Sequence, residues 1–100
     1  EPSHFDPAKA YIAVDMHLLG DSKPYIYKTT NYGKSWQLIT TESNGIPSDF
    51  TARVLREDPV REGLLYAGTE YGMFVSFDDG KSWESLSSIL AEYYFWWAVD

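Results

Sequence analysis

The chain has 100 residues, of which 44 % are hydrophobic and 17 % aromatic, enough for the core of one ordinary domain. Its 15 acidic and 8 basic residues give a formal charge of −7 with no basic run, which argues against nucleic acid or an anionic membrane as a partner. Cysteine is absent from the sequence and there are only two histidines, so we expect no metal and no cofactor.

Membrane and export signals are also missing from the sequence as given. No apolar stretch approaches the roughly 18 residues of a membrane span. The first four residues lack the basic and apolar regions of a signal peptide, although a leader could have been removed. We expect a soluble chain and leave its compartment open.

The first half of the chain predicts a sheet of at least three strands. Asp6-Pro7 breaks the chain and starts it in an extended direction. A polar loop follows at residues 16–24, residues 25–30 alternate apolar with polar residues, and a tight turn at residues 31–33 leads to the hairpin partner. The expected strands are residues 10–15, 25–30 and 36–40.

The second half predicts a four-stranded sheet. Residues 41–49 are dense in turn formers and should cross from the first sheet to the second. The expected strands are residues 50–57, 64–69, 73–77 and 83–86. The first sheet therefore lacks the innermost strand that the second sheet has.

The tail, residues 87–100, supplies a candidate for that strand. Residues 95–100 of one chain, followed by residues 1–7 of another, would mimic residues 50–59. We expect the tail to complete the first sheet of a neighbouring copy; folding back onto residues 10–15 of its own chain would need strong distortion. The assembly residues are Tyr93, Tyr94, Phe95, Trp96 and Trp97.

One motif occurs twice, at residues 29–36 and 76–83. Both copies read Ser/Thr-x-Asp/Asn-x-Gly-x-Ser-Trp, and Trp36 and Trp83 lie 47 positions apart. A repeat of about 40 to 50 residues with several short strands is typical of a β-propeller blade. Because about three or more such units are needed for stability, two blades should not be a finished molecule.

The motif resembles the Asp-box, or BNR repeat, of sialidase-type propellers. Its longer context, residues 56–80, resembles bacterial propellers related to the sortilin (Vps10) luminal domain and to xyloglucanase-type glycosidases. The resemblance covers residues 1 to about 86. It implies an all-β fold with two four-stranded blades per chain, the first in residues 1–40 and the second in residues 41–86. The tail departs from it, which suggests a recombined or engineered chain.

In such families the box is structural and lies away from the ligand face. Asn31 replaces the usual aspartate but keeps the turn chemistry. A metal role for Asp78 and Asp79 is the weaker interpretation, because adjacent carboxylates usually point apart. The structural positions are Thr29, Asn31, Gly33, Trp36, Ser76, Asp78, Gly80 and Trp83.

Catalysis in these families requires an arginine cluster or a carboxylate pair, and the sequence pairs none of its loop acids. We therefore expect a non-enzymatic unit that self-assembles into a closed propeller of three to five chains. The alternative is a fragment of a glycoside-hydrolase-like or carbohydrate-binding propeller, with its ligand on the face that carries residues 16–24 and 41–49. The candidate ligand-face residues are Asp15, His17, Asp49, Glu70 and Tyr71.

Overall fold

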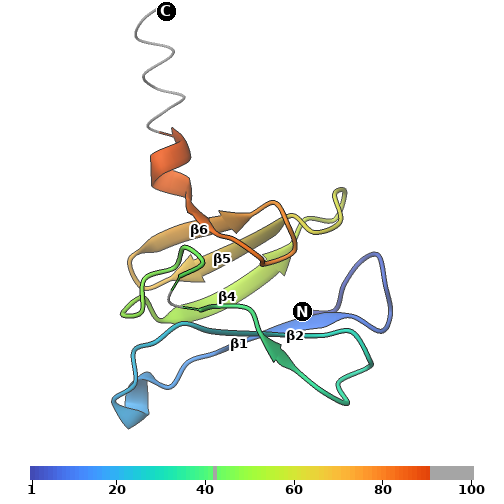
Figure 1. Ribbon diagram of the computed structural model, residues 1–100, viewed down its shortest axis with the longest axis horizontal. Coiled ribbons are helices and arrows are strands. Elements are labelled where there is room, and N and C mark those ends of the chain that lie inside the picture. The colour runs from blue at the N-terminus through green and yellow to red at the C-terminus, as the bar shows by residue number, and fades with distance from the viewer. Residues whose placement is uncertain (42, 91–100) are drawn as a thin grey trace, which may run out of the picture.

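The computed structural model describes residues 1–41 and 43–90 as two antiparallel β-sheets (Figure 1). The first sheet contains β1 (Ala10–Val14), β2 (Tyr25–Thr29) and β3 (Gln37–Leu38). The second contains β4 (Ala52–Glu57), β5 (Leu65–Thr69), β6 (Gly72–Ser76) and β7 (Glu84–Ser85). The predicted all-β class is confirmed. The strand expected at residues 93–99, with its five aromatic assembly residues, lies outside the described residues.

Neighbouring strands in each sheet are also neighbours in sequence, so each sheet is a simple meander. β1 and β2 pair without interruption from Ala10 opposite Thr29 to Val14 opposite Tyr25. Their β-branched and aromatic residues suit a pleated surface that is covered on one face. In the second sheet, the register of β4 against β5 shifts between Ala52 and Val54, so alternation is interrupted at Arg53.

The outermost strands are shorter than predicted. β3 and β7 have two residues each, and residue 86, predicted to end a strand, begins a short helix over residues 86–90. Leu86 and Ile89 in this helix are partly buried, whereas Ser87 and Ser88 between them are exposed. That three-residue spacing follows a helical period and not the period of two that a strand requires. The predicted polar loop contains the 3₁₀ turn η1 (His17–Leu19).

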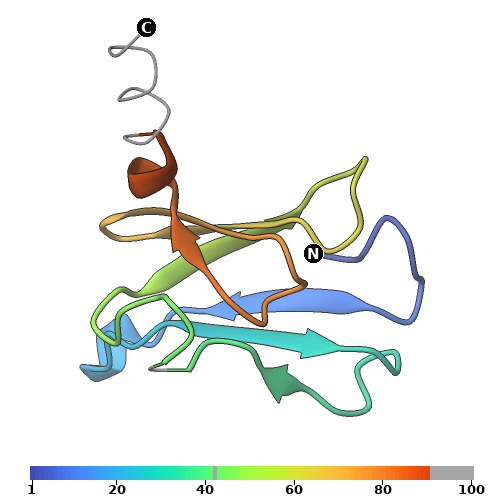
Figure 2. The same ribbon diagram turned by 45° about the horizontal axis from the view of Figure 1, so that its top comes forward.

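The two sheets lie face to face as two layers (Figure 2), with β1 and β2 against β4. Tyr11 and Ile26 from the first sheet are buried against apolar residues of the second. The second sheet contributes Leu55, Leu65, Ala67 and Phe74 to this core. No helix in residues 1–41 or 43–90 is long and apolar enough to cross a membrane.

The linker between the sheets is held by Trp83, the residue before β7. The Trp83 amide donates to the Asn44 carbonyl (2.7 Å), and the Asn44 side-chain amide donates to the Ile39 carbonyl (2.8 Å). Gly45, at φ 123°, passes so close that a Cβ there would lie 2.0 Å from the Trp83 carbonyl oxygen. Ile46 is buried beside them. The linker therefore packs as part of the sheet-to-sheet contact.

Candidate assembly interface

The second box is a turn closed by its own side chains. The Ser76 hydroxyl accepts from the Gly80 amide and donates to Asp78 Oδ1, both at 2.8 Å. Asp78 also accepts from the Ser82 amide (2.9 Å) and hydroxyl (2.7 Å). Hydrogen bonds from the Ser82 side chain, and then from its amide and from Ser76, hold the pKa of Asp78 below its usual range. The Asp78 carboxylate is thus engaged within its own loop.

The first box repeats this network with an amide. The Gly33 amide donates to Thr29 Oγ1 (2.9 Å), Thr29 donates to Asn31 Oδ1 (2.9 Å), and the Ser35 amide donates to the same oxygen (3.0 Å). The difference is that Asn31 Nδ2 donates to the Ser35 hydroxyl (2.8 Å), whereas in the second box the serine donates. Asparagine therefore reverses one hydrogen bond and preserves the turn.

Both boxes also share an unusual backbone. Tyr32 and Asp79, at corresponding positions, have φ values of 61° and 60° in the left-handed region, which few non-glycine residues adopt. The Tyr32 amide donates to the Ala8 carbonyl and the Asp79 amide to the Gly63 carbonyl, each at 2.9 Å. The glycine after each residue has a positive φ as well. The two boxes are therefore copies at the level of backbone hydrogen bonds.

The two box tryptophans differ in environment. Trp83 is 4 % exposed and donates its indole N–H to the Ile39 carbonyl of the first sheet (3.1 Å). Trp36, at the corresponding position, is 44 % exposed. Trp83 has a second sheet to pack against, whereas no other described sheet covers Trp36.

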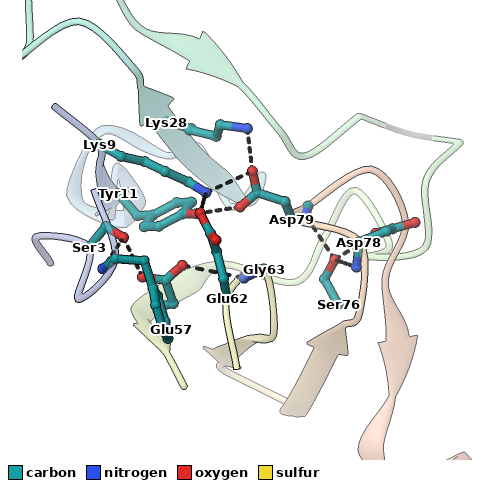
Figure 3. Close-up of polar contacts among 12 residues, drawn as sticks. Ser3, Lys9, Tyr11, Lys28, Glu57, Glu62, Gly63, Ser76, Asp78 and Asp79 are labelled. Carbon is teal, nitrogen blue, oxygen red and sulfur yellow. Dashed lines mark hydrogen bonds and ion pairs between the residues drawn. The ribbon is translucent and has the colours of Figure 1, made fainter. Parts of the chain in front are cut away.

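Asp79, unlike Asp78, extends out of its box to the first sheet (Figure 3). Its Oδ2 accepts from Lys28 Nζ at 2.6 Å and lies 3.1 Å from Lys9 Nζ, and its Oδ1 accepts from the Tyr11 hydroxyl. We call Lys9, Tyr11, Lys28 and Asp79 the ionic seam. Burial opposes ionisation of Asp79, but the bonds from Lys28, Tyr11 and Lys9 outweigh it and hold its pKa below the usual range. Burial, together with the bond to Asp79, raises the pKa of Tyr11, which keeps the phenol neutral.

A second buried carboxylate holds the N-terminal segment. Glu57 is 3 % exposed and its Oε1 accepts from the Ser3 hydroxyl (2.7 Å) and the His4 amide (3.2 Å) (Figure 3). Its other oxygen accepts from the Gly63 amide at 3.4 Å. The first residues are thereby tied to the second sheet although they lie beside the first.

The N-terminal segment occupies part of the free edge of β1. The Glu1 amine donates to the Tyr11 carbonyl (2.8 Å), the Tyr11 amide donates to the Glu1 carbonyl (2.9 Å), and Pro2 bridges to Ala10. Among residues 1–41 and 43–90, no strand pairs with this edge beyond Tyr11, so β1 is the edge strand of its sheet. An unpaired strand edge is a template for another strand.

Each sheet also leaves one face open. On the first sheet, Tyr11 and Ile26 point into the core, so alternation places Ile12 (45 % exposed) and Tyr27 on the opposite face. A groove of about 300 Å³ lies partly over this face, lined by residues that include Tyr25, Leu38 and Ile46. The open face of the first sheet comprises Ile12, Tyr25, Tyr27 and Leu38. The open face of the second sheet comprises Val54, Tyr66 and Met73.

The candidate ligand-face residues are only partly brought together. Arg53 on β4 has its guanidinium nitrogens 3.4 Å from Asp15 Oδ2 and 3.9 Å from Glu70 Oε1. Tyr71, beside Glu70, is 65 % exposed and its ring contacts Phe50 at 5.0 Å between centroids. Asp49 is exposed in the linker, and the backbone of His17 lies in η1. In residues 1–41 and 43–90, no group of three or more potential metal-ligating side chains converges.

Sequence reasoning missed the residues that join the two sheets. Lys9, Lys28 and Glu57 are separated by tens of residues from their partners and are indistinguishable in sequence from solvated charges. For Asp79, the sequence offered one indication of its role, namely its position in the box directly before a glycine that needs a positive φ. This position indicates that Asp79 lies in the turn, but it does not indicate which residues the carboxylate binds.

Comparison with known proteins adds no family assignment: no model of a known protein family matches the chain, and no curated protein sequence shows significant similarity to it.

Proposed function

We propose that this chain is a self-assembling structural unit that closes head to tail into a β-propeller of three to five copies, without catalytic activity. One observation carries the proposal: the two sheets pack through different faces, although their strands correspond position by position. Ala67 and Phe74 on the second sheet are buried against the first sheet. The corresponding residues of the first sheet, Ile12 and Tyr27, lie on its open face.

The same comparison holds in the other direction. Ile26 of the first sheet is fully buried against the second, whereas Met73, its counterpart, is 40 % exposed on the open face. The open face of the first sheet therefore corresponds to the buried face of the second, and the open face of the second corresponds to the buried face of the first. On two copies, these open faces would meet as the two buried faces meet within one chain. Two such faces on one molecule make a heterologous contact, which generates a ring when its rotation closes.

The free edge of β1 supports the same arrangement. Glu1 already pairs with Tyr11 in the position that an inner strand would occupy. The pairing of Pro2 with Ala10 in the first sheet corresponds to that of Glu57 with Leu65, which joins the inner strand β4 to β5 in the second. In the proposal, residues 95–100 of a neighbouring copy continue this line along β1. Closure of the ring then leaves neither an open face nor a long unpaired edge.

The deciding experiment is the absolute mass in solution, measured by light scattering coupled to size exclusion. The proposal expects a sharp species at three, four or five times the 11.5 kDa chain mass. Three copies would correspond to six blades, four to eight, and five to ten. A compact monomer would contradict the proposal.

A carbohydrate-binding role is the second candidate, favoured by the meeting of Asp15 and Glu70 at Arg53 beside the exposed Tyr71. Tyrosine faces can stack on sugar rings while carboxylates accept from hydroxyls. Both carboxylates are ion-paired with Arg53, which disfavours a catalytic carboxylate pair. Glycan-array binding that is lost in Asp15→Asn or Glu70→Gln supports this role, whereas no binding across a broad panel leaves the scaffold function alone.

A further inference from the structure

Tyr32 and Asp79 hold corresponding positions but carry opposite chemistry. Their φ values, 61° and 60°, and their amide hydrogen bonds of 2.9 Å are the same. Asp79 reaches across to the first sheet and is part of the ionic seam, while Tyr32 is 72 % exposed. The side chain at this position of the box is therefore the one that meets the neighbouring sheet.

The surface that Tyr32 would meet follows from the same correspondence. Lys9, Tyr11 and Lys28 of the first sheet correspond to Leu64, Tyr66 and Val75 of the second, as the paired registers of β1 with β2 and of β5 with β6 show. Two ammonium groups are thus replaced by aliphatic side chains. Tyr66 keeps its phenol, which here donates to Asp58 Oδ2 at 3.2 Å.

We infer, resting on the proposed assembly, that Asp79 and Tyr32 fix the order of sheets in the ring by selecting different partners. The second box docks on the ionic seam of its own chain, and the first box docks through Tyr32 on Leu64 and Tyr66 of another copy. Because the two contact surfaces have unlike chemistry, neither box can take the other's place, and this reinforces the alternation of first and second sheets that head-to-tail closure requires.

Mispairing is disfavoured in both directions. A second box against a second sheet would desolvate Asp79 beside Leu64 and Val75, where no ammonium takes the place of Lys9 or Lys28. Arg56, opposite Tyr66 on this face, is already paired with Glu1 at 3.2 Å. A first box against a first sheet would leave Lys9 and Lys28 facing a tyrosine ring without their carboxylate. Specific recognition commonly combines a matched pair with such penalties against the wrong partner.

The test is Tyr32→Asp, with Tyr32→Phe as the matched control. Aspartate tolerates the left-handed conformation well, so the turn should fold, and circular dichroism and thermal melting check that it does. A carboxylate beside Leu64 and the Asp58 carboxylate should weaken association by about tenfold or more. Tyr32→Phe keeps the ring and should retain the wild-type mass.

A rescue variant makes the pairing specific. Adding Leu64→Lys to Tyr32→Asp places an ammonium where Lys9 stands in the ionic seam, and should restore the oligomer in a salt-sensitive form. A wild-type monomer would refute the proposed assembly itself. A wild-type oligomer that Tyr32→Asp leaves intact, or a dissociated Tyr32→Asp that Leu64→Lys fails to restore, would overturn this inference while the assembly stands.

Discussion

Asp78 and Asp79 are adjacent in the second box, but their carboxylates bind different parts of the structure. Asp78 satisfies the amide and hydroxyl of Ser82 within the turn, and Asp79 leaves the turn to bind Lys9 and Lys28. The left-handed backbone at Asp79 is what turns the two carboxylates apart. One residue thus shapes the box and the next attaches it to another sheet.

Asp79→Asn removes the charge while keeping a residue that tolerates positive φ. We expect it to lower the free energy of unfolding by about 2 to 3 kcal/mol at neutral pH, because Lys9 is left nearly buried without its closest anion. The folded pKa of Asp79 lies below its unfolded value of about 3.9, so its contribution is present above that pH and disappears as the pH falls through the folded pKa. Urea unfolding at one protein concentration, at about pH 7 and about pH 2, measures the difference.

Asp49→Asn is the control, since it removes the same charge from an exposed linker position. It should change stability by no more than about 0.5 kcal/mol. A gap between wild type and Asp79→Asn that stays constant down to low pH would contradict the ionic role of Asp79.

At the scale of elements, the linker is fixed as firmly as the strands are. The Trp83 amide bonds to Asn44, and the Gly45 backbone lies against the Trp83 carbonyl where no side chain fits. The contact joins Trp83, just before β7 of the second sheet, to the segment that leaves the first. The relative placement of the sheets therefore depends on a glycine outside both of them.

Gly45→Ala should be strongly destabilising because the new methyl group meets backbone and not a flexible side chain. We expect a loss of about 3 kcal/mol or more, from unfavourable φ and overpacking together. Gly20→Ala separates the two effects, because Gly20 has φ 78° but open space around its would-be Cβ. It should lose only about 1 kcal/mol. Thermal melts of both variants compare them, and equal losses would show that the clash at Gly45 is relieved.

The sequence predicted the two sheets and both box turns because local patterns determine them. Alternating residues indicated β2, the Asp6-Pro7 break before an apolar run indicated β1, and the glycines of the two boxes, Gly33 and Gly80, marked turns that have a positive φ. The ends of β3 and β7 were placed too far along, since two-residue pairing leaves almost no pattern. The ionic seam was missed because Lys28 and Asp79 meet only after both sheets have formed and packed.

At the scale of the whole molecule, the proposed assembly would use the contact within one chain as its template. The contact between its two sheets shows how a first sheet meets a second. The exposed Ile12 and Met73 and the half-buried Tyr27 and Tyr66 lie on the faces that would repeat this contact between copies. Apolar side chains on open faces also favour uncontrolled aggregation if the ring fails to close. The tail is the segment we expect to decide between these outcomes.

Deleting residues 93–100 should give insoluble protein or a poorly folded monomer, because the edge of β1 then has no strand to complete it. Replacing the same residues with a glycine–serine segment of equal length should fail in the same way, since such a segment has little strand propensity. Light scattering and hydrogen exchange of the soluble fraction would measure this. A well-folded monomer from either variant would rule out the strand-exchange arrangement.

The attachment of each box to its own sheet uses a backbone amide and a backbone carbonyl, Tyr32 to Ala8 and Asp79 to Gly63. Every residue except proline can donate such a bond, so beyond tolerance of the left-handed conformation the turn does not dictate which side chain it presents. The two copies of the box therefore carry a tyrosine and an aspartate on the same backbone conformation. In the proposed assembly, that single difference turns an array of equivalent junctions into one with two distinct kinds.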